Sequence, residues 1–307
     1  MSIHHNIGDI DIEQSVLTVG SFDGVHCGHR VLLQRVIDLA KENGCRSLVV
    51  TFWPHPRTVL DTNGTTSLLL NTLDEKIELL TRTGIDDVLV LPFDMHLAQM
   101  SASGFIEEII AGKLKARVLV VGEDHHFGKG RSGNASSLSA MKMNDMKIEV
   151  VKLKKLDQKI SSSFIRKSLL SGDLPLANKM LGYDYRISGK VIHGNQLGRT
   201  IGFPTANIEV PGYKLLPKDG VYRVEVRPDR SRSLPYLGMM YIGKRPVLKE
   251  KDTLRHIEVN IFDFNEQIYG TDIVLSLTHR IRDDINFNNI HQLAQQLNQD
   301  KQTILNI

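Results

Sequence analysis

Two histidines in a glycine-rich stretch, His26 and His29, are the residues best suited to chemistry. They lie three residues apart, so both side chains share one face if the first turn of a helix includes them. Gly20, Gly24 and Gly28 let the backbone approach a ligand closely, and a helix N-terminus offers free amide groups to an anion. Imidazole rings placed there can donate hydrogen bonds to phosphate oxygens as their charge grows. This pattern, residues 20–29, is named the glycine–histidine loop and indicates attack on a nucleotide phosphate.

Two further stretches in the first half of the chain carry groups suited to a ligand. Trp53 and His55 leave a predicted strand beside Pro54 and Pro56, and aromatic rings with rigid prolines can line one side of a planar ring. Asp124 lies in a glycine-rich segment, where its carboxylate can hold a metal ion or a ribose. Both stretches are therefore candidates for binding parts of a nucleotide or its acceptor.

A polar stretch further along offers a second phosphate contact. Ser161, Ser162 and Ser163 precede a predicted helix, and Arg166 is expected in its first turn. A guanidinium group matches the geometry of phosphate oxygens, so this stretch can form a clamp. Plain helix capping explains the serines equally well, and both interpretations stay open.

Apolar segments alternate with helical patterns from residue 15 to about residue 160. Unbroken apolar strands separated by helices predict a parallel sheet covered on both faces. Ligands of such sheets bind beyond the carboxyl ends of the strands. The glycine–histidine loop, the loop after Phe52 and the loop after Val121 all lie at that edge. The predicted strands are residues 15–19, 46–52, 87–91, 118–121 and 148–151.

The pattern changes after residue 183, where strand-like segments are separated by glycine, proline and aspartate turns. Several of these segments alternate apolar and polar residues, which is typical of an all-β barrel. A final helix is expected from Ile290 to Leu305, and a linker from residue 172 to residue 183. Two domains are therefore predicted, residues 1–182 and 183–307. The predicted barrel strands are residues 185–192, 221–226, 237–242, 256–262 and 272–277.

The second half has its own candidate site. Gly198 and Gly202 allow the backbone to wrap around a phosphate. Thr205 and Asn207 alternate along an extended segment, so their oxygens point to one side and suit a magnesium ion carried by ATP. Glu258 lies inside an apolar strand, where a carboxylate can act as the general base for a substrate hydroxyl. The alternative is that Glu258 faces solvent on the polar side of its strand.

The composition limits the class of protein. With 307 residues, 41% of them hydrophobic, the chain can form one large domain or two ordinary ones. Its net charge of +3 is too small to argue for a nucleic-acid partner, and no apolar run is long enough to predict a membrane span. Cys27 and Cys45 form no disulfide framework, and the first residues show no secretory signal. We therefore expect a cytoplasmic protein.

The motifs of the first half resemble a known family. The order Gly20-x-Phe22-Asp23-Gly24-x-His26-x-Gly28-His29, then Thr51-Phe52-x-Pro54-His55-Pro56, then Ile160-Ser161-Ser162-Ser163-x-Ile165-Arg166, is similar to the adenylyltransferase half of bacterial bifunctional riboflavin kinase/FAD synthetases. The resemblance implies a Rossmann-like nucleotidyltransferase domain in which His26 and His29 stabilise the α-phosphate in the transition state. The residues then expected to bind ATP in this half are Gly20, Phe22, Asp23, Gly28, Asp124, Ser162, Ser163 and Arg166.

In that arrangement Ser162, Ser163 and Arg166 hold the β- and γ-phosphates, and Asp124 helps to bind ATP and magnesium. The flavin is expected against Trp53, Pro54, His55 and Pro56. One departure from the family pattern is His125, which stands where an aromatic residue is frequent.

The second half resembles the riboflavin kinase domain, a small β-barrel. The matching motifs are Gly198-Arg199-x-Ile201-Gly202-x-Pro204-Thr205-Ala206-Asn207, Asp219-Gly220-Val221-Tyr222, Gly243-x-Arg245-Pro246, Glu258-x-x-Ile261-Phe262-Asp263-Phe264 and Tyr269-Gly270. The resemblance implies that Gly198, Thr205 and Asn207 bind ATP, the last two with its magnesium, and that Glu258 is the base. Asn260 stands where the family usually has a histidine, and Val247 stands where a threonine is common.

The resulting hypothesis is a bifunctional flavin-coenzyme transferase that requires Mg²⁺ with ATP. The barrel phosphorylates riboflavin to FMN with release of ADP, and the N-terminal domain adenylylates FMN to FAD with release of pyrophosphate. An alternative is a flavin- or nucleotide-binding regulator with one inactive domain. A third hypothesis, adenylyl transfer to another coenzyme precursor, fits the first site alone and leaves the second domain unexplained.

Overall fold

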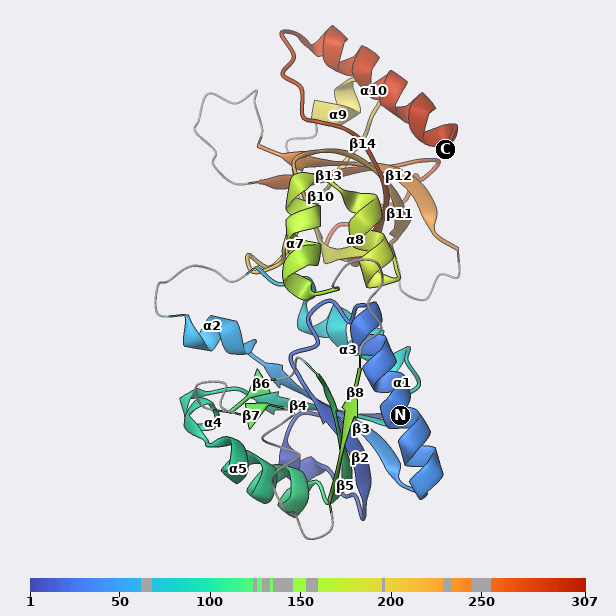
Figure 1. Cartoon of the computed structure of the whole chain (residues 1–307). Coiled ribbons are helices and arrows are strands. Elements are labelled where there is room, and N and C mark those ends of the chain that lie inside the picture. The colour runs from blue at the N-terminus through green and yellow to red at the C-terminus, as the bar shows by residue number, and fades with distance from the viewer. Residues whose placement is uncertain are drawn as a thin grey trace. The chain divides into compact units, whose positions relative to one another are not determined.

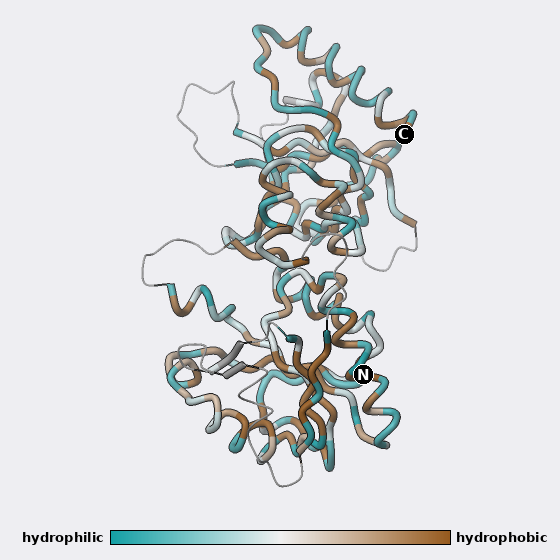
Figure 2. The backbone as a smooth tube through the Cα atoms, in the orientation of Figure 1, coloured by the Kyte–Doolittle hydropathy of each residue, from teal (hydrophilic) through white to brown (hydrophobic). Residues whose placement is uncertain are grey.

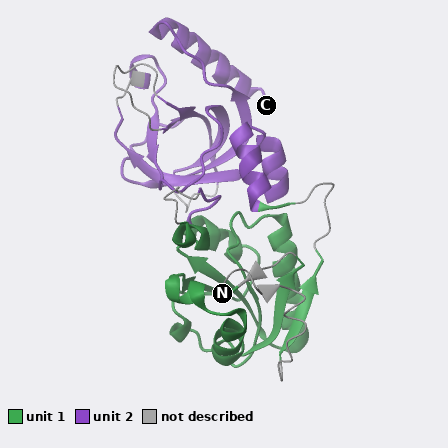
Figure 3. Cartoon of the chain, turned by 60° about the vertical axis from the view of Figure 1, so that its left-hand side comes forward, with its two compact units in different colours: residues 1–67, 73–161 green, residues 68–72, 162–307 purple. Residues whose placement is uncertain are grey.

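The computed structural model of the chain describes residues 1–61, 68–123, 126–128, 133–134, 146–152, 160–194, 197–228, 234–244 and 255–307. The chain forms two compact units, residues 1–67 with 73–161 and residues 68–72 with 162–307 (Figure 3). Each unit has a sheet of its own. The helices between residues 162 and 181 belong to the second unit, and the expected domain boundary at residue 182 stays a prediction.

The first unit contains a six-stranded sheet in the order β1-β4-β3-β2-β5-β8. Figure 1 labels β2, β3, β4, β5 and β8 of this sheet. Every neighbouring pair of strands is parallel, so the predicted parallel α/β sheet is confirmed. The strands are β1 (Ser2–His4), β2 (Ser15–Val19), β3 (Arg46–Trp53), β4 (Asp87–Pro92), β5 (Ala116–Gly122) and β8 (Lys147–Val151). The short strands β6 (His126–Phe127) and β7 (Gly133–Asn134) pair with each other.

Helices connect these strands and cover the sheet. They are a 3₁₀ turn (Ile7–Asp9), α1 (Cys27–Asn43), α2 (Pro56–Leu60), α3 (Leu73–Thr81), α4 (Met95–Gln99), α5 (Ala102–Gly104) and a π-helix (Phe105–Lys113). All five residues of β2 are buried, as a central strand between two helical layers requires. Leu17 and Leu48 pack with Phe105 and Ile110 of the π-helix in one hydrophobic cluster. The tube of these central strands is brown, that is hydrophobic, in Figure 2.

The second unit contains a closed antiparallel barrel in the order β10-β13-β12-β11-β14-β9. Its strands are β9 (Tyr185–Ile192), β10 (Ala206–Glu209), β11 (Gly220–Arg227), β12 (Tyr236–Gly243), β13 (His256–Ile261) and β14 (Asp272–Arg282). The helices of this unit are α7 (Ser162–Ser171), α8 (Leu174–Leu181), α9 (Leu197–Thr200) and α10 (Ile290–Leu305). The predicted barrel and the terminal helix are therefore confirmed.

The linker expected between residues 172 and 183 is wrong, because most of that segment is helix α8. Asp173 caps the helix by accepting a hydrogen bond from the backbone N–H of Leu176 at 3.1 Å. Gly182 ends it in the left-handed conformation, with φ of 74°. Glycine and aspartate at the two ends were thus helix caps and not signs of an extended connection.

Helix α10 is fixed to the barrel by one apolar and one ionic contact. Ile304 is fully buried in a cluster that contains Phe203 and Phe262. Arg282, at the end of β14, donates hydrogen bonds of 2.8 to 3.0 Å to the carboxylate of buried Asp300. Because Phe203 lies just before Thr205 in the chain, this helix also supports the segment that carries the second candidate site.

Candidate nucleotide sites

The glycine–histidine loop joins β2 to α1 at the carboxyl edge of the parallel sheet. Phe22, Gly24 and Val25 have φ of 48°, 88° and 35°. Left-handed backbone is costly for a β-branched residue such as valine, and strain of this kind clusters at functional sites. A Cβ placed on Gly20 would lie 3.1 Å from the Phe22 ring. The loop is therefore closely packed and held in one strained conformation.

His26 and His29 come together at the start of α1, as the sequence predicts. Their rings are stacked, with centroids 3.6 Å apart and planes 15° apart. His26 caps the helix, because its Nδ1 accepts a hydrogen bond from the backbone N–H of His29 at 3.3 Å. Burial lowers the pKa of His26 to about 4, so its ring is neutral near pH 7. With Nδ1 as the acceptor, the single ring proton lies on Nε2 and is available for donation.

The other residues predicted around this site are partly brought together. Asp23 and Gly28 are buried in the same loop. The loop follows β2, which lies between β3 and β5 in the sheet, so the three predicted loops follow neighbouring strands. Asp124 and His125 lie outside the described residues.

The segment predicted to contact the flavin follows β3. The Trp53–Pro54 peptide bond is cis, Pro54 is exposed and Trp53 is half-buried. His55 is buried and caps α2, because its Nδ1 accepts a hydrogen bond from the backbone N–H of Arg57 at 3.1 Å. Pro56, half-buried, is the first residue of that helix. His55 therefore has a defined structural task, while Trp53 and the prolines present rings at the end of the strand.

Lys76 is a residue that the sequence analysis missed at this edge of the sheet. It projects from α3, is 4% exposed, and donates to the hydroxyl of Thr51 at 2.9 Å and to the carbonyl of Phe52 at 3.1 Å. The sequence did contain a sign of this residue, because Lys76 lies on the same helix face as Leu79 and Leu80. That face is expected to be buried, and a lysine on it needs acceptors inside the protein.

The proposed second phosphate clamp lies at the start of α7. Ser162 and Ser163 are the first two residues of that helix. Arg166 is its fifth residue and so begins the second turn, one turn later than expected. Its Nε donates to the carbonyl of Leu68 at 2.8 Å. These residues belong to the second compact unit, whereas the two histidines belong to the first.

The second candidate site forms where β10 and β13 pair. Asn207 and Glu258 are direct partners in this antiparallel pair, so their side chains share one face. The Thr205 hydroxyl donates to Oε2 of Glu258 at 3.4 Å. A Cβ on Gly194 would lie 2.0 Å from the amide of Asn207, and one on Gly198 would lie 2.2 Å from a backbone carbonyl oxygen. The predicted grouping of Thr205, Asn207 and Glu258 is thus present, with Glu258 half-buried.

Asn260 supports this site from the same strand as Glu258. It is 7% exposed, and its Nδ2 donates to the carbonyl of Pro204 at 2.7 Å. That carbonyl directly precedes Thr205, so the bond fixes the position of the segment that carries Thr205. Asn260, which replaces the histidine usual in the family, therefore makes a specific hydrogen bond in this site. Val247, the other departure in this half, lies outside the described residues.

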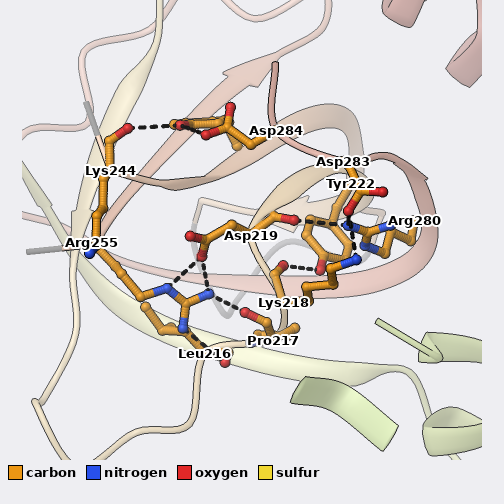
Figure 4. A network of polar contacts seen from close by, with 11 residues as sticks. Leu216, Pro217, Lys218, Asp219, Tyr222, Lys244, Arg255, Arg280, Asp283 and Asp284 are labelled. Atoms are coloured by element: carbon orange, nitrogen blue, oxygen red, sulfur yellow. Dashed lines mark hydrogen bonds and ion pairs between the residues drawn. The ribbon is translucent and has the colours of Figure 1, made fainter. Parts of the chain in front are cut away.

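A polar network borders the second site and includes the tyrosine opposite Glu258. Tyr241 pairs with Glu258 across β12 and β13, and its hydroxyl lies 3.1 Å from Oδ2 of Asp284. Burial raises the pKa of Tyr241, and the negative charges of Asp284, Asp219 and Glu258 add to the effect, so the phenol stays protonated. Asp219 accepts from Arg255 at 2.6 Å (Figure 4).

The rest of the network is made of close contacts between Arg280, near the end of β14, and the residues of two loops. Arg280 donates to the backbone carbonyl of Asp219 at 2.9 Å and to the carboxylate of Asp283 at 2.6 Å (Figure 4). Lys218 pairs with the same carboxylate at 2.7 Å. These two cations lower the pKa of Asp283 to about 2. The network therefore links residues 218–219, Arg255 and residues 280–283. Arg255 directly precedes β13, the strand that carries Glu258.

Two family models match the chain, one for each half. The FAD synthetase model matches residues 9–164 and the riboflavin kinase model matches residues 181–307. The structure has a histidine pair at the edge of a parallel sheet and a Thr, Asn and Glu group on a closed barrel. Together with the two family models, these sites define the class of protein: an ATP-using transferase with a nucleotidyltransferase half and a kinase half.

Curated relatives carry both halves in one chain. The Bacillus subtilis bifunctional riboflavin kinase/FMN adenylyltransferase is 38% identical, covering 97% of this chain and 94% of its own. The Escherichia coli K12 enzyme of that name is 35% identical, and the match covers 97% of this chain and 94% of that enzyme. The chain therefore belongs to the family of bifunctional riboflavin kinase/FMN adenylyltransferases.

A solved structure from Streptococcus pneumoniae shares this fold. It is titled a macrolide-efflux protein, is 32% identical, covers 100% of this chain and 99% of its own, and has a TM-score of 0.87. Its title names a different activity from the curated relatives, and the matched family models are those of the flavin enzymes. Within the described part of the chain, no helix combines the length and the apolar character needed to cross a membrane.

Proposed function

We propose that the second unit transfers the γ-phosphoryl group of ATP to riboflavin, giving FMN and ADP. The first unit then transfers the adenylyl group of another ATP to FMN, giving FAD and pyrophosphate. The observation that carries this proposal is the match of both family models, in this order, to a chain that has a phosphate-type site in each half. The supporting geometry is the His26–His29 pair in one unit and the Thr205, Asn207 and Glu258 group in the other.

In adenylyl transfer, an oxygen of the FMN phosphate attacks the α-phosphorus of ATP and pyrophosphate leaves. His26 serves this step as a neutral donor through Nε2–H, since its lowered pKa prevents it from carrying a charge near pH 7. The amide groups at the start of α1 add positive potential at the same point. Gly20, Phe22, Asp23 and Gly28 shape the ATP-binding loop in this proposal.

The remaining assignments of this half follow the same proposal. Trp53, Pro54 and Pro56 contact the flavin, and His55 holds that segment by capping α2. Ser162, Ser163 and Arg166 hold the β- and γ-phosphates, and Asp124 helps to bind ATP and its metal ion. The support for these roles is the order and spacing of the motifs.

In the kinase half, Glu258 accepts the proton of the ribityl hydroxyl as the oxygen attacks the γ-phosphorus of ATP. Thr205 and Asn207 supply a hydroxyl and an amide oxygen beside that carboxylate, and these hard oxygen donors suit Mg²⁺. Gly194 and Gly198 let the chain pack closely around these donors, because a Cβ on Gly194 would clash with the Asn207 amide and one on Gly198 with the carbonyl oxygen of Phe203. The residues present therefore fit a magnesium ion delivered with ATP, which neutralises phosphate charge when bound.

The direct test is one incubation of the purified chain with riboflavin, ATP and magnesium, followed by separation of the flavins by chromatography. Riboflavin should be converted first to FMN and then to FAD, with release of ADP and pyrophosphate. If riboflavin and ATP bind but neither FMN nor FAD forms, the chain is a binding protein and the proposal fails. We place the reaction in the cytoplasm.

A further inference from the structure

Lys76 is a buried cation whose contacts converge on the loop that carries the histidines. Its ammonium group donates to the Thr51 hydroxyl at 2.9 Å, the Phe52 carbonyl at 3.1 Å and the Ser21 carbonyl at 3.3 Å. An ammonium group has three donors, so these three acceptors satisfy it. Two of the acceptors lie at the end of β3 and the third lies in the glycine–histidine loop. One side chain thus links two segments assigned to the first site.

The Ser21 carbonyl is held from two directions. It accepts from Lys76 and also from the hydroxyl of Thr51 at 3.2 Å. The next residue, Phe22, begins the strained part of the loop, with φ of 48°. A carbonyl fixed by two donors immediately before such a residue constrains the path of the backbone that follows, up to His26.

Fold stability alone does not account for a lysine at this position. Lys76 lies on the face of α3 that also carries buried Leu79 and Leu80, where an apolar side chain would avoid the cost of burying a charge. That cost appears as a pKa lowered by burial to about 8, an effect that the nearby charge of Asp23 opposes. A buried donor set of this kind provides directional bonds that a leucine or methionine cannot provide.

We propose that Lys76 is a positioning residue for adenylyl transfer, which orients the glycine–histidine loop by holding the Ser21 carbonyl against the end of β3. It does not touch the reacting atoms. Its effect is to place the His26 ring and the amide groups of the helix start where the α-phosphate must bind. This inference rests on the proposed function of the first unit and adds a residue to it.

The test uses Lys76→Met, which keeps the length and apolar stem of the side chain and removes its donors. FMN-to-FAD turnover should fall about tenfold or more in kcat, because misplaced catalytic groups act on the transition state. The KM values for FMN and ATP should change by less than about threefold. Riboflavin-to-FMN turnover, which belongs to the second unit, should be unchanged, and the nearly normal KM values for FMN and ATP show that the first unit is folded. Lys41→Met, on the exposed side of α1, is the matched control and should leave both reactions unchanged.

Thr51→Val provides a second, nearly isosteric perturbation of the same contacts. It removes the hydroxyl that donates to Ser21 and accepts from Lys76, so it should also lower kcat for FAD formation. The double variant should lose less than the product of the two single losses, because both act through one carbonyl.

Full FAD-forming activity in folded Lys76→Met would overturn the inference, as would a loss confined to KM. If Lys76→Met does not fold, an unchanged kcat in Thr51→Val overturns it instead. Failure of the unmodified chain to make FAD from FMN is a different result, because it refutes the proposed function and not the role of Lys76.

Discussion

Removing the amide donor of Asn260 should damage the kinase half and spare the adenylyltransferase half. The side chain is 7% exposed and its Nδ2 lies 2.7 Å from the carbonyl oxygen of Pro204. Asn260→Leu keeps a similar shape and leaves that carbonyl without its donor. The bond is part-buried and Pro204 itself is exposed, so the loss of the bond costs about 0.5 to 1.5 kcal/mol. Because the carbonyl precedes Thr205, this cost should appear in ATP binding, as a rise of about two- to tenfold in the KM for ATP.

The assay measures initial rates of FMN formation from riboflavin over a range of ATP concentrations. FAD formation from supplied FMN is measured on the same sample and should be unchanged. Asn298→Leu is the matched control, because its side-chain amide also donates to a backbone carbonyl, at 2.9 Å, but on the exposed side of α10. Asn260→His keeps a ring N–H donor and should retain more activity than Asn260→Leu. A normal KM for ATP in Asn260→Leu would show that this hydrogen bond does not position Thr205 for ATP binding.

Three further perturbations test other parts of the structure. Since the pKa of His26 is lowered to about 4, the unfolded state binds more protons between pH 4 and 6.5, and stability should fall as pH decreases through that range. In denaturant unfolding, the free energy of unfolding should fall by about 2 kcal/mol between pH 8 and pH 5, and this fall should be absent in His26→Asn. Equal falls in both proteins would contradict the lowered pKa of His26. Asp300→Ala leaves half-buried Arg282 without its carboxylate partner and should destabilise the barrel by about 3 kcal/mol in the same measurement. A loss below about 1 kcal/mol would mean that the pair behaves like a surface one. Gly198→Ala places a Cβ 2.2 Å from the carbonyl oxygen of Phe203. The KM for ATP of the kinase reaction should therefore rise, and FAD formation from FMN should be unchanged. A wild-type KM would show that the loop relaxes at no cost.

The two folds were predictable because the two kinds of strand differ in the sequence. Strand β2 is apolar enough to be buried at all five positions, which is typical of a parallel sheet. Strand β11 alternates buried and half-buried residues from Val224 onward, which is typical of a barrel. The segment around α8 was misjudged because its capping residues, Asp173 and Gly182, are also common in linkers.

The sites were predictable only where the chemistry lies within a short motif. His26 and His29 are neighbours along one helix turn, so their stacking follows from spacing. Lys76 contacts carbonyl groups, which carry no residue-type signal, in segments remote in the sequence. The bond from Asn260 to the Pro204 carbonyl is hidden for the same reason. Long-range bonds to backbone acceptors depend on the fold itself, and the sequence pattern does not contain them.

Each unit should carry one of the two reactions, and a pair of variants tests this division. His29→Ala should convert riboflavin to FMN but form no FAD. Glu258→Gln should form no FMN from riboflavin yet make FAD at the normal rate when FMN is supplied. If either substitution stops both reactions in a folded protein, the two reactions share one site and are not divided between the units.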